Sequence, residues 1–270
     1  MLEILKELIA RTKPAPLPAT PAGERIYAIG DVHGHLDLLN ALLEQIEADD
    51  AARGDARTTL ILLGDLVDRG PDSAGVVRRV RGLTEGSGRP TDWRIHALQG
   101  NHEEMFLASF DDPEALRSLL GFGARETLAS YGIVVEASEN ADMAHVQRRM
   151  KAEIPEDDRA FLANLKDMVQ VGDYIFVHAG LRPQTPLSMQ IGRDMRWIRE
   201  PFLSHDGDFG GVVIHGHTIR HEPECRHNRI GIDTGAYVHG TLTAIGLEGT
   251  EQWFLQAHTV EARDTVQAEL

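Results

Sequence analysis

Short apolar runs that end in glycine and a polar residue recur along the first hundred residues of the chain. Three of them have the length of buried strands: RIYAIGD (25–31), TTLILLGD (58–65) and WRIHALQGNHE (93–103). After each of the first two, apolar residues recur at helical spacing, over 36–46 and 76–80. Strands that alternate with helices are typical of βαβ units, so this pattern predicts an α/β fold built around a sheet.

The second half of the chain changes character twice. From 103 to about 166 the strand-like runs fade and short amphipathic segments predict a helical insertion. Strand-like runs then resume as DYIFVHAG (173–180), GVVIHGH (211–217), RIGIDTG (229–235), TLTAIGL (241–247) and EQWFLQA (251–257). Because the last four have no long helical segment between them, we expect a largely antiparallel or mixed sheet there.

The two ends of the chain lie outside this pattern. Residues 1–22 begin with apolar residues at helical spacing and continue into a proline-rich stretch, which predicts a short helix followed by a linker. Residues 261–270 are polar and predict a loosely held tail. We therefore expect one domain over 23–260, with the helical insertion at about 103–166 inside it.

The composition narrows the class of protein. Of 270 residues, 42% are hydrophobic and 26% are charged, which suffices for a globular core. The formal net charge of −15 repels nucleic-acid phosphates and anionic lipids, so general nucleic-acid binding and membrane binding are not expected. The single cysteine, Cys225, allows neither an internal disulfide nor a thiolate-built metal site. No apolar run approaches the roughly 20 residues of a membrane span and no secretion signal is apparent, so a cytoplasmic location is expected.

Side chains that bind metals stand at the ends of the strand-like runs. Strand ends can meet at one rim of an α/β sheet, so residues distant in sequence can form one site there. The candidate ligands are Asp31, His33, Asp65, Asn101, His178 and His217. Oxygen and nitrogen donors without sulfur suit Mn²⁺, Fe or Zn²⁺, and six are too many for one ion. Shared between two ions with one bridging carboxylate, they fit the two-metal pattern of phosphoryl transfer.

Glycine comes directly before four of these residues, Asp31, Asp65, Asn101 and His217. We expect each glycine to permit the tight turn that aims the following side chain at the rim.

With these motifs the chain resembles the calcineurin-like metallophosphoesterases, and within them the bacterial and phage branch of the phosphoprotein phosphatase family. The matching segments follow in the order of that family: GDVHGH (30–35), GDLVDRG (64–70), GNHE (100–103), VHAG (177–180) and GHT (216–218). IDTGA (232–236) also resembles the segment after the last ligand. The fold implied by the resemblance is a two-sheet β-sandwich flanked by helices.

The resemblance also implies a role for individual residues. Asp65 would bridge two divalent ions, Mn²⁺ in the first place with Fe or Zn²⁺ as alternatives. The other ligands would be Asp31 and His33 for one ion, and Asn101, His178 and His217 for the second. A hydroxide activated by both ions would attack phosphorus in line. His102 would protonate the leaving oxygen with Asp68 orienting it, and Arg69 and Arg199 would bind the phosphoryl group.

Several substrate classes stay open at this point. The leading expectation is a phosphorylated serine or threonine on protein, extending to phosphotyrosine, because the phage-type relatives act that way. A dinucleoside polyphosphate or another small phosphorylated metabolite is the alternative, and a non-catalytic phosphate-binding module is a third. Gln99 stands where many relatives have arginine before GNH, which predicts weaker phosphate binding or an altered substrate. The sequence leaves the native metal and the oligomeric state open.

Overall fold

The structure is a computed structural model, and it describes residues 17–88, 90, 92–135 and 142–259. The predicted N-terminal helix and the polar tail at 261–270 lie outside the described residues. Two sheets of five strands each form the centre of the described part of the chain.

The first sheet has the strand order β10-β9-β1-β2-β3. Its strands β1 (Glu24–Ile29), β2 (Arg57–Leu62) and β3 (Arg94–Ala97) run parallel. The crossovers between them contain α2 (Leu36–Arg53) and α3 (Ser73–Thr84), as the hydrophobic pattern predicts. On the other side of β1, β9 (Thr241–Glu248) and β10 (Glu251–His258) add antiparallel strands.

The second sheet has the strand order β4-β5-β6-β8-β7. Strands β5 (Tyr174–Val177), β6 (Val212–His215) and β8 (Arg229–Gly231) run parallel. The edge strands β4 (Met168–Val171) and β7 (Glu224–Cys225) run antiparallel to their neighbours and were not expected from the sequence. This sheet is mixed, which the sequence analysis allowed for the second half of the chain. Of the four runs on which that expectation rested, however, β6 and β8 pair parallel, and the last two, β9 and β10, belong to the first sheet.

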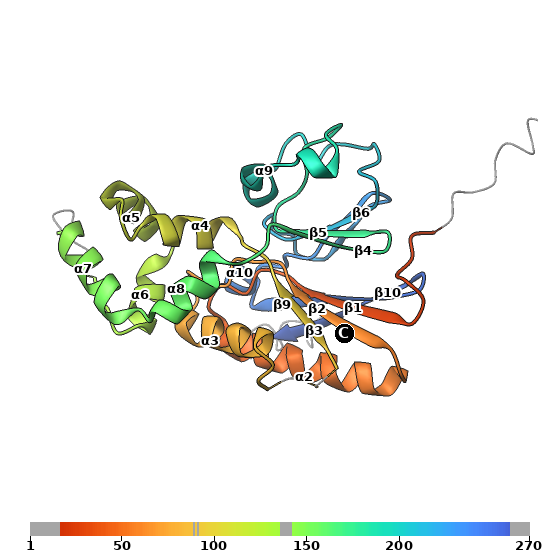
Figure 1. Ribbon diagram of the computed structural model, residues 1–270, viewed down its shortest axis with the longest axis horizontal. Helices are drawn as coiled ribbons and strands as arrows, with labels where there is room; N and C mark the ends of the chain where they lie inside the picture. Colours follow the sequence, from red (N-terminus) through yellow and green to blue (C-terminus); the bar gives the residue numbers. More distant parts are fainter. Residues whose placement is uncertain (1–16, 89, 91, 136–141, 260–270) are drawn as a thin grey trace, which may run out of the picture.

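Alternation along the strands explains how the layers pack. Successive side chains of a strand point to opposite faces, so Ile26 and Ala28 of β1 face the second sheet, where they meet Phe176 of β5. Tyr27 and Ile29 of the same strand face α2 and α3. A two-sheet sandwich flanked by helices results, which confirms the predicted fold class (Figure 1).

The remaining helices cover the outer faces and one end of the sandwich. The outer face of the second sheet packs against the segment that contains η1 (Leu187–Met189) and α9 (Gly192–Trp197). Among the described residues, five helices lie between β3 and β4 in the chain, and they are found to one side of the sheets in Figure 1. They are α4 (Asn101–Ala108), α5 (Pro113–Leu120), α6 (Ala124–Ser130), α7 (Met143–Glu153) and α8 (Glu156–Ala163). The short helix α10 (Ala236–His239) connects β8 to β9.

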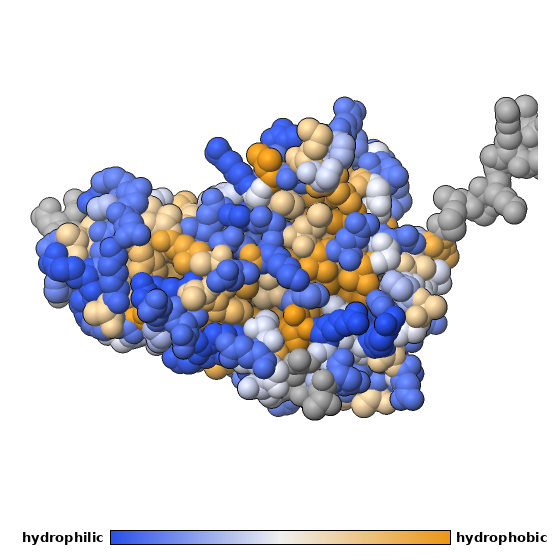
Figure 2. All heavy atoms as spheres, viewed as in Figure 1, coloured by the Kyte–Doolittle hydropathy of each residue, from blue (hydrophilic) through white to orange (hydrophobic). Residues whose placement is uncertain are grey.

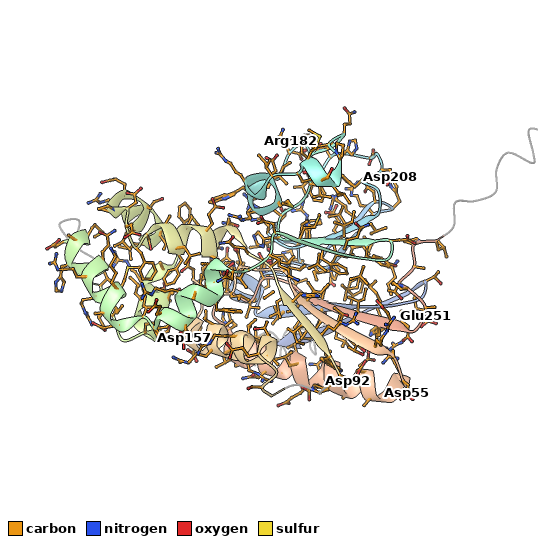
Figure 3. All side chains as sticks on the ribbon, viewed as in Figure 1. Asp55, Asp92, Asp157, Arg182, Asp208 and Glu251 are labelled. Atoms are coloured by element: carbon orange, nitrogen blue, oxygen red, sulfur yellow. The ribbon has the colours of Figure 1, made fainter. Side chains whose placement is uncertain are left out.

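The surface carries much of the acidic charge. Hydrophilic residues cover much of the face shown in Figure 2. Asp55, Asp92, Asp157, Asp208 and Glu251 lie at the periphery of the molecule in Figure 3.

Within the described part of the chain, no helix has the length and apolar character of a membrane span.

Candidate metal centre

The candidate site lies where the ends of the parallel strands of both sheets converge. The loops that follow β1 and β2 carry Asp31 and Asp65, and Asn101 is the first residue of α4 after β3. The loops after β5 and β6 carry His178 and His217. A cavity of about 190 Å³ opens there, and six of the predicted site residues line it: Asp65, Arg69, Asn101, His102, Arg199 and His217. The other four predicted site residues do not line the cavity and are buried beside it: Asp31, His33, Asp68 and His178.

The backbone of these loops is held in an unusual conformation. Six described residues other than glycine have a left-handed φ, and Gln184 is the only one of the six that the sequence did not mark as a site residue. The others are His33 (44°), Asp65 (46°), Asp68 (71°), Arg69 (73°) and His217 (62°). Such conformations cost of order 1–3 kcal/mol each and persist only where the surrounding structure enforces them. Their concentration here indicates that the fold is strained to aim these side chains.

Glu103 enforces the conformation of two of the loops, a role that the sequence analysis did not assign. Its carboxylate is fully buried and accepts hydrogen bonds from the backbone N–H groups of Asp65 (2.9 Å), Leu66 (2.7 Å) and Val67 (3.2 Å). It also accepts one from Gly100 (2.8 Å) at the start of α4. One side chain therefore ties the loop after β2 to the loop after β3.

The glycines before the candidate ligands have a different role from the one expected. Only Gly64 among the four has a left-handed φ, at 101°. At Gly100 an added Cβ would lie 2.1 Å from Asp65 Oδ1, and at Gly216 it would lie 2.0 Å from Asp31 Oδ1. Glycine is required at these two positions because the carboxylates occupy the space of a side chain.

The histidine rings are oriented by the backbone. His33 Nδ1 lies 2.8 Å from the carbonyl oxygen of Val67, and His178 Nδ1 lies 2.9 Å from that of Leu63. Since a carbonyl oxygen can only accept, each Nδ1 carries the proton and donates it. Each Nε2 then presents a lone pair to the site, which is the usual way in which a protein prepares histidine to bind a metal.

The atoms that face one another at the centre are hydrogen-bond acceptors. His178 Nε2 lies 3.0 Å from Asn101 Oδ1 and 3.4 Å from Asp65 Oδ1. His33 Nε2 lies 3.5 Å from the other oxygen of Asp65. His217 Nε2 is buried and has no hydrogen-bond partner among the described residues. Acceptors that face acceptors without a proton between them fit a bound cation.

Two groups of side chains are arranged closely enough to hold an ion each. His33, Asp65 and His102 form one, and Asp65, His178 and His217 form the other, with the ligand atoms of each group within 4.8 Å of one another. Asp65 belongs to both, as the sequence predicts for a bridging ligand. The donor set of carboxylate oxygen and imidazole nitrogen fits divalent cations.

The electrostatics of the site favour the protonation states that metals require. Burial lowers the pKa of His33 and of His217 to about 3, so both imidazoles are neutral at pH 7. Burial alone would raise the pKa of Asp65, but the surrounding histidines, His178 first among them, lower it below its ordinary value. Neutral histidines around an ionised carboxylate bind a metal without having to release protons.

His102 stands at the edge of this centre in a different environment. Its Nδ1 lies 2.7 Å from Asp68 Oδ2, and its Nε2 lies 3.2 Å from Nη2 of Arg69. Burial by itself lowers the pKa of His102, but the carboxylates of Asp65 and Asp68 outweigh burial and raise the pKa above its ordinary value. Because a guanidinium can only donate, Nε2 is the acceptor in its contact with Arg69, and the raised pKa favours the uptake of a proton there.

Thr127 of α6 holds Asp68 from the other side. Its hydroxyl donates to Asp68 Oδ1 (2.7 Å) and accepts from the Asp68 N–H (2.8 Å). Thr127→Val is expected to lower the free energy of unfolding by about 1–3 kcal/mol, because it removes a hydrogen bond to a buried carboxylate. Urea unfolding of the metal-free protein measures this.

The matched control is Thr59→Val. Thr59 is a buried residue of β2 and is not among the hydrogen-bond partners of Asp68. Equal losses of stability in the two variants would show that the bond to Asp68 is not what Thr127 contributes.

Two arginines bring positive charge to the cavity. The guanidinium carbon of Arg69 lies 4.0 Å from the ring centroid of Tyr237, which also contacts the ring of His33 edge-on at 5.2 Å. Arg199 donates from Nη2 to the carbonyl oxygen of His217 (3.2 Å). Both arginines are thus restrained beside the candidate metal ligands.

Comparison with known proteins agrees with this geometry. The sequence model of the calcineurin-like phosphoesterases matches residues 24–240, which is most of the chain. The chain belongs to the calcineurin-like phosphoesterase family. The members of this hydrolase family share the two-sheet fold described above, and two candidate ion-binding groups that share a carboxylate are present in this member.

Among curated proteins, this calcineurin-like phosphoesterase is similar to symmetrical bis(5'-nucleosyl)-tetraphosphatases. The one from Klebsiella pneumoniae subsp. pneumoniae is 31% identical over 183 residues, which cover 67% of this chain and 51% of the relative. The one from Cronobacter sakazakii is 30% identical over 175 residues, which cover 64% of this chain and 49% of the relative. The chain therefore spans about half the length of the curated relatives it matches.

Solved structures of other proteins share the fold of this chain. A crystal structure of a candidate diadenosine tetraphosphatase superposes with a TM-score of 0.59 at 22% identity, covering 88% of this chain and 98% of the other. The cold-active protein-tyrosine phosphatase of a psychrophilic Shewanella gives 0.54 at 17% identity, covering 88% and 83%. At such identities the likeness establishes the fold.

Proposed function

We propose that this calcineurin-like phosphoesterase hydrolyses a phosphoric ester or anhydride with two divalent ions held around Asp65. The two ligand groups that share Asp65 support the proposal. The first of them contains His102 and not Asp31, and we assign Asp31 to the metal and His102 to proton transfer on the family resemblance. Asp31 and His33 would bind one ion together with Asp65, and the second would be bound by Asp65 and three further residues, Asn101, His178 and His217. Mn²⁺ is our first choice of metal, and Fe and Zn²⁺ suit the same donors.

The ions and the side chains have separate tasks in this proposal. When bound, divalent cations supply positive charge to the phosphoryl oxygens and lower the pKa of water toward ~7. Arg69 and Arg199 bind the phosphoryl oxygens from the rim, where a guanidinium can donate two parallel hydrogen bonds. His102 donates the proton at Nε2 to the leaving oxygen, and Asp68 keeps its ring oriented through Nδ1. Gln99 is neutral, so it supplies no third positive charge, and its side chain is buried and does not line the cavity.

For the substrate we favour a dinucleoside polyphosphate, the alternative in the sequence analysis. The curated relatives at about 30% identity are tetraphosphatases of this kind. A phosphoprotein is the second candidate, and it is supported by the likeness of the GDLVDRG and VHAG segments to bacterial and phage phosphoprotein phosphatases. The cavity, at about 190 Å³, has room for a phosphoryl group and its immediate neighbours, so the rest of either substrate would lie outside it.

Phosphate release and product analysis on a panel of substrates test the proposal. Metal-stripped protein is reloaded with Mn²⁺ and given diadenosine tetraphosphate, a phosphoserine peptide, a phosphotyrosine peptide and an aryl phosphate. We expect the highest kcat/KM for diadenosine tetraphosphate. Faster hydrolysis of either peptide would move the assignment to a protein phosphatase. Metal binding without turnover of any substrate would leave a phosphate-binding module.

Arg69→Lys is expected to raise KM by roughly tenfold, since lysine cannot form the paired hydrogen bonds of a guanidinium and one such bond is worth about 1.4 kcal/mol. Steady-state kinetics on the best substrate of the panel measure it. Arg57→Lys is the control, because Arg57 is exposed and pairs with Glu24 at the opposite end of β2. An unchanged KM for Arg69→Lys would rule out a phosphate-binding role for this residue.

A further inference from the structure

Asp233 is a buried carboxylate in the cavity that the sequence analysis left without a role. It follows β8 directly, lines the cavity together with Asp65 and Arg69, and is only 4% exposed. Its Oδ1 accepts a hydrogen bond from the N–H of Gly235 (3.0 Å), which fixes the orientation of the carboxylate.

The close approach of two strand ends places Asp31 and Asp233 together. A Cβ added at Gly30 would lie 2.6 Å from the carbonyl oxygen of Ile232 and 3.6 Å from the Cα of Asp233. The end of β1 in the first sheet therefore touches the end of β8 in the second. The backbone segments that carry Asp31 and Asp233 therefore lie side by side.

Three carboxylates, those of Asp31, Asp65 and Asp233, are thus buried around one small cavity, each less than 5% exposed. Burying like charges side by side is costly unless cations compensate them. Arg69 is one compensating cation on the rim of the cavity. The backbone N–H of His217 donates to both oxygens of Asp31, at 3.2 and 3.0 Å, while the Nε2 atom of His217 is buried without a partner. The unpartnered nitrogen points independently to a cation in the same cavity.

We propose that Asp233 is a third carboxylate of the first metal site, where it helps Asp31 and His33 to hold a divalent cation. The inference rests on the two-metal centre of the proposed function. It adds to that centre a ligand group from the loop after β8, and it gives the first ion a residue from each sheet. The competing explanation is that Asp31 and Asp233 share one proton and stabilise only the fold.

Mn²⁺ binding by Asp233→Asn distinguishes the two explanations. Asparagine keeps the size of the side chain and the oxygen that accepts from Gly235, but removes the charge. Titration of the metal-free protein with Mn²⁺, followed by electron paramagnetic resonance of the free ion, gives the affinity of each site without any enzyme assay. We expect one of the two sites to weaken by about 10–100-fold and the other to stay unchanged.

Asp208→Asn is the matched control. Asp208 also accepts a hydrogen bond from the backbone N–H two residues later, that of Gly210 (2.8 Å), but it lies at the periphery of the molecule (Figure 3). It therefore loses the same charge in the same local geometry, and both Mn²⁺ affinities are expected to match those of the unsubstituted protein. Weakening of one site by Asp208→Asn to the same extent as by Asp233→Asn would overturn the inference.

A second variant covers the case in which Asp233→Asn does not fold, as judged by circular dichroism. Asp233→Glu keeps the charge and moves it by one methylene, and it too is expected to change the affinity of one site only. If the folded variants bind two Mn²⁺ ions as tightly as the unsubstituted protein, Asp233 is not a metal-binding residue. If the unsubstituted protein itself binds no Mn²⁺, the two-metal centre of the proposed function fails along with this inference.

Discussion

Replacing His102 with asparagine is expected to lower kcat by about 10²–10⁴-fold on a phosphoester with a poor leaving group, the range typical of general-acid catalysis. The 2.7 Å contact between His102 Nδ1 and Asp68 leaves Nε2, which accepts from Arg69 in the structure, as the nitrogen that would take up and deliver the proton. Asparagine retains a polar side chain there but cannot deliver a proton. The metal content, measured by mass spectrometry, is expected to stay within error of that of the unsubstituted protein.

The dependence on the leaving group separates catalysis from a structural effect. A series of aryl phosphates with leaving groups of falling pKa needs progressively less help from an acid, so the loss in kcat is expected to shrink along the series. A merely distorted site would lose the same factor on every substrate. His96→Asn is the control. His96 lies on β3, its Nδ1 atom is 3.1 Å from Nζ of Lys166, and it does not line the cavity. Near-normal turnover of a poor leaving group by His102→Asn would contradict the acid role.

Glu103→Gln is expected to cost the largest amount of stability of any single change discussed for this chain, about 3 kcal/mol. Both carboxylate oxygens accept two backbone N–H groups each, and the amide nitrogen of glutamine would face two of these donors with a donor of its own. Hydrogen bonds to charged groups contribute about 1.5–3 kcal/mol each, and buried donors left without an acceptor add a desolvation cost. The metal-free protein is expected to melt about 6–12 °C lower, from 2–4 °C per kcal/mol at this size.

Glu104→Gln makes the same change one position along α4. Glu104 is 39% exposed and contacts Arg196 and Trp197 instead of the loop after β2. Exposed pairs of this kind contribute about 0–1 kcal/mol, so the Tm is expected to fall by no more than a few degrees. Calorimetry of the two variants decides the matter, and equal Tm values would show that the four backbone contacts of Glu103 carry little of the stability.

The sequence predicts the fold class because the apolar runs have the right lengths and end at the motifs. It does not reveal the edge strands β4 and β7. The first has only four residues, one of them the polar Gln170, and the second has two, so neither is long enough to show a period. Helices are expected between 103 and 166, and the structure has helices there, but their packing on α3 depends on contacts that no local pattern reports. The division into N-terminal segment, domain and tail remains a prediction.

Within the site, the sequence indicates residues that follow strands but not the residues that hold them. Glu103 and Thr127 bind backbone groups of the loop after β2, which lies 36 and 59 residues before them in the chain. Contacts over such separations cannot be predicted from the spacing of residues in the sequence. Asp233 is different, because RIGI before it is another apolar run that ends in aspartate, and the same argument that marks Asp31 and Asp65 could have marked it. The assignment of catalytic and metal-binding roles stays a prediction until the variants are measured.

The position of the candidate ligands on the two sheets has a mechanical consequence. Asp65 follows a strand of the first sheet, whereas His178 and His217 follow strands of the second. An ion bound by all three would therefore cross-link the two sheets. A ligand that binds only the folded state stabilises it in proportion to the logarithm of its concentration over its Kd. Cellular supply of the metal would in this way set how firmly the two halves of the fold are joined, whatever substrate the cavity receives.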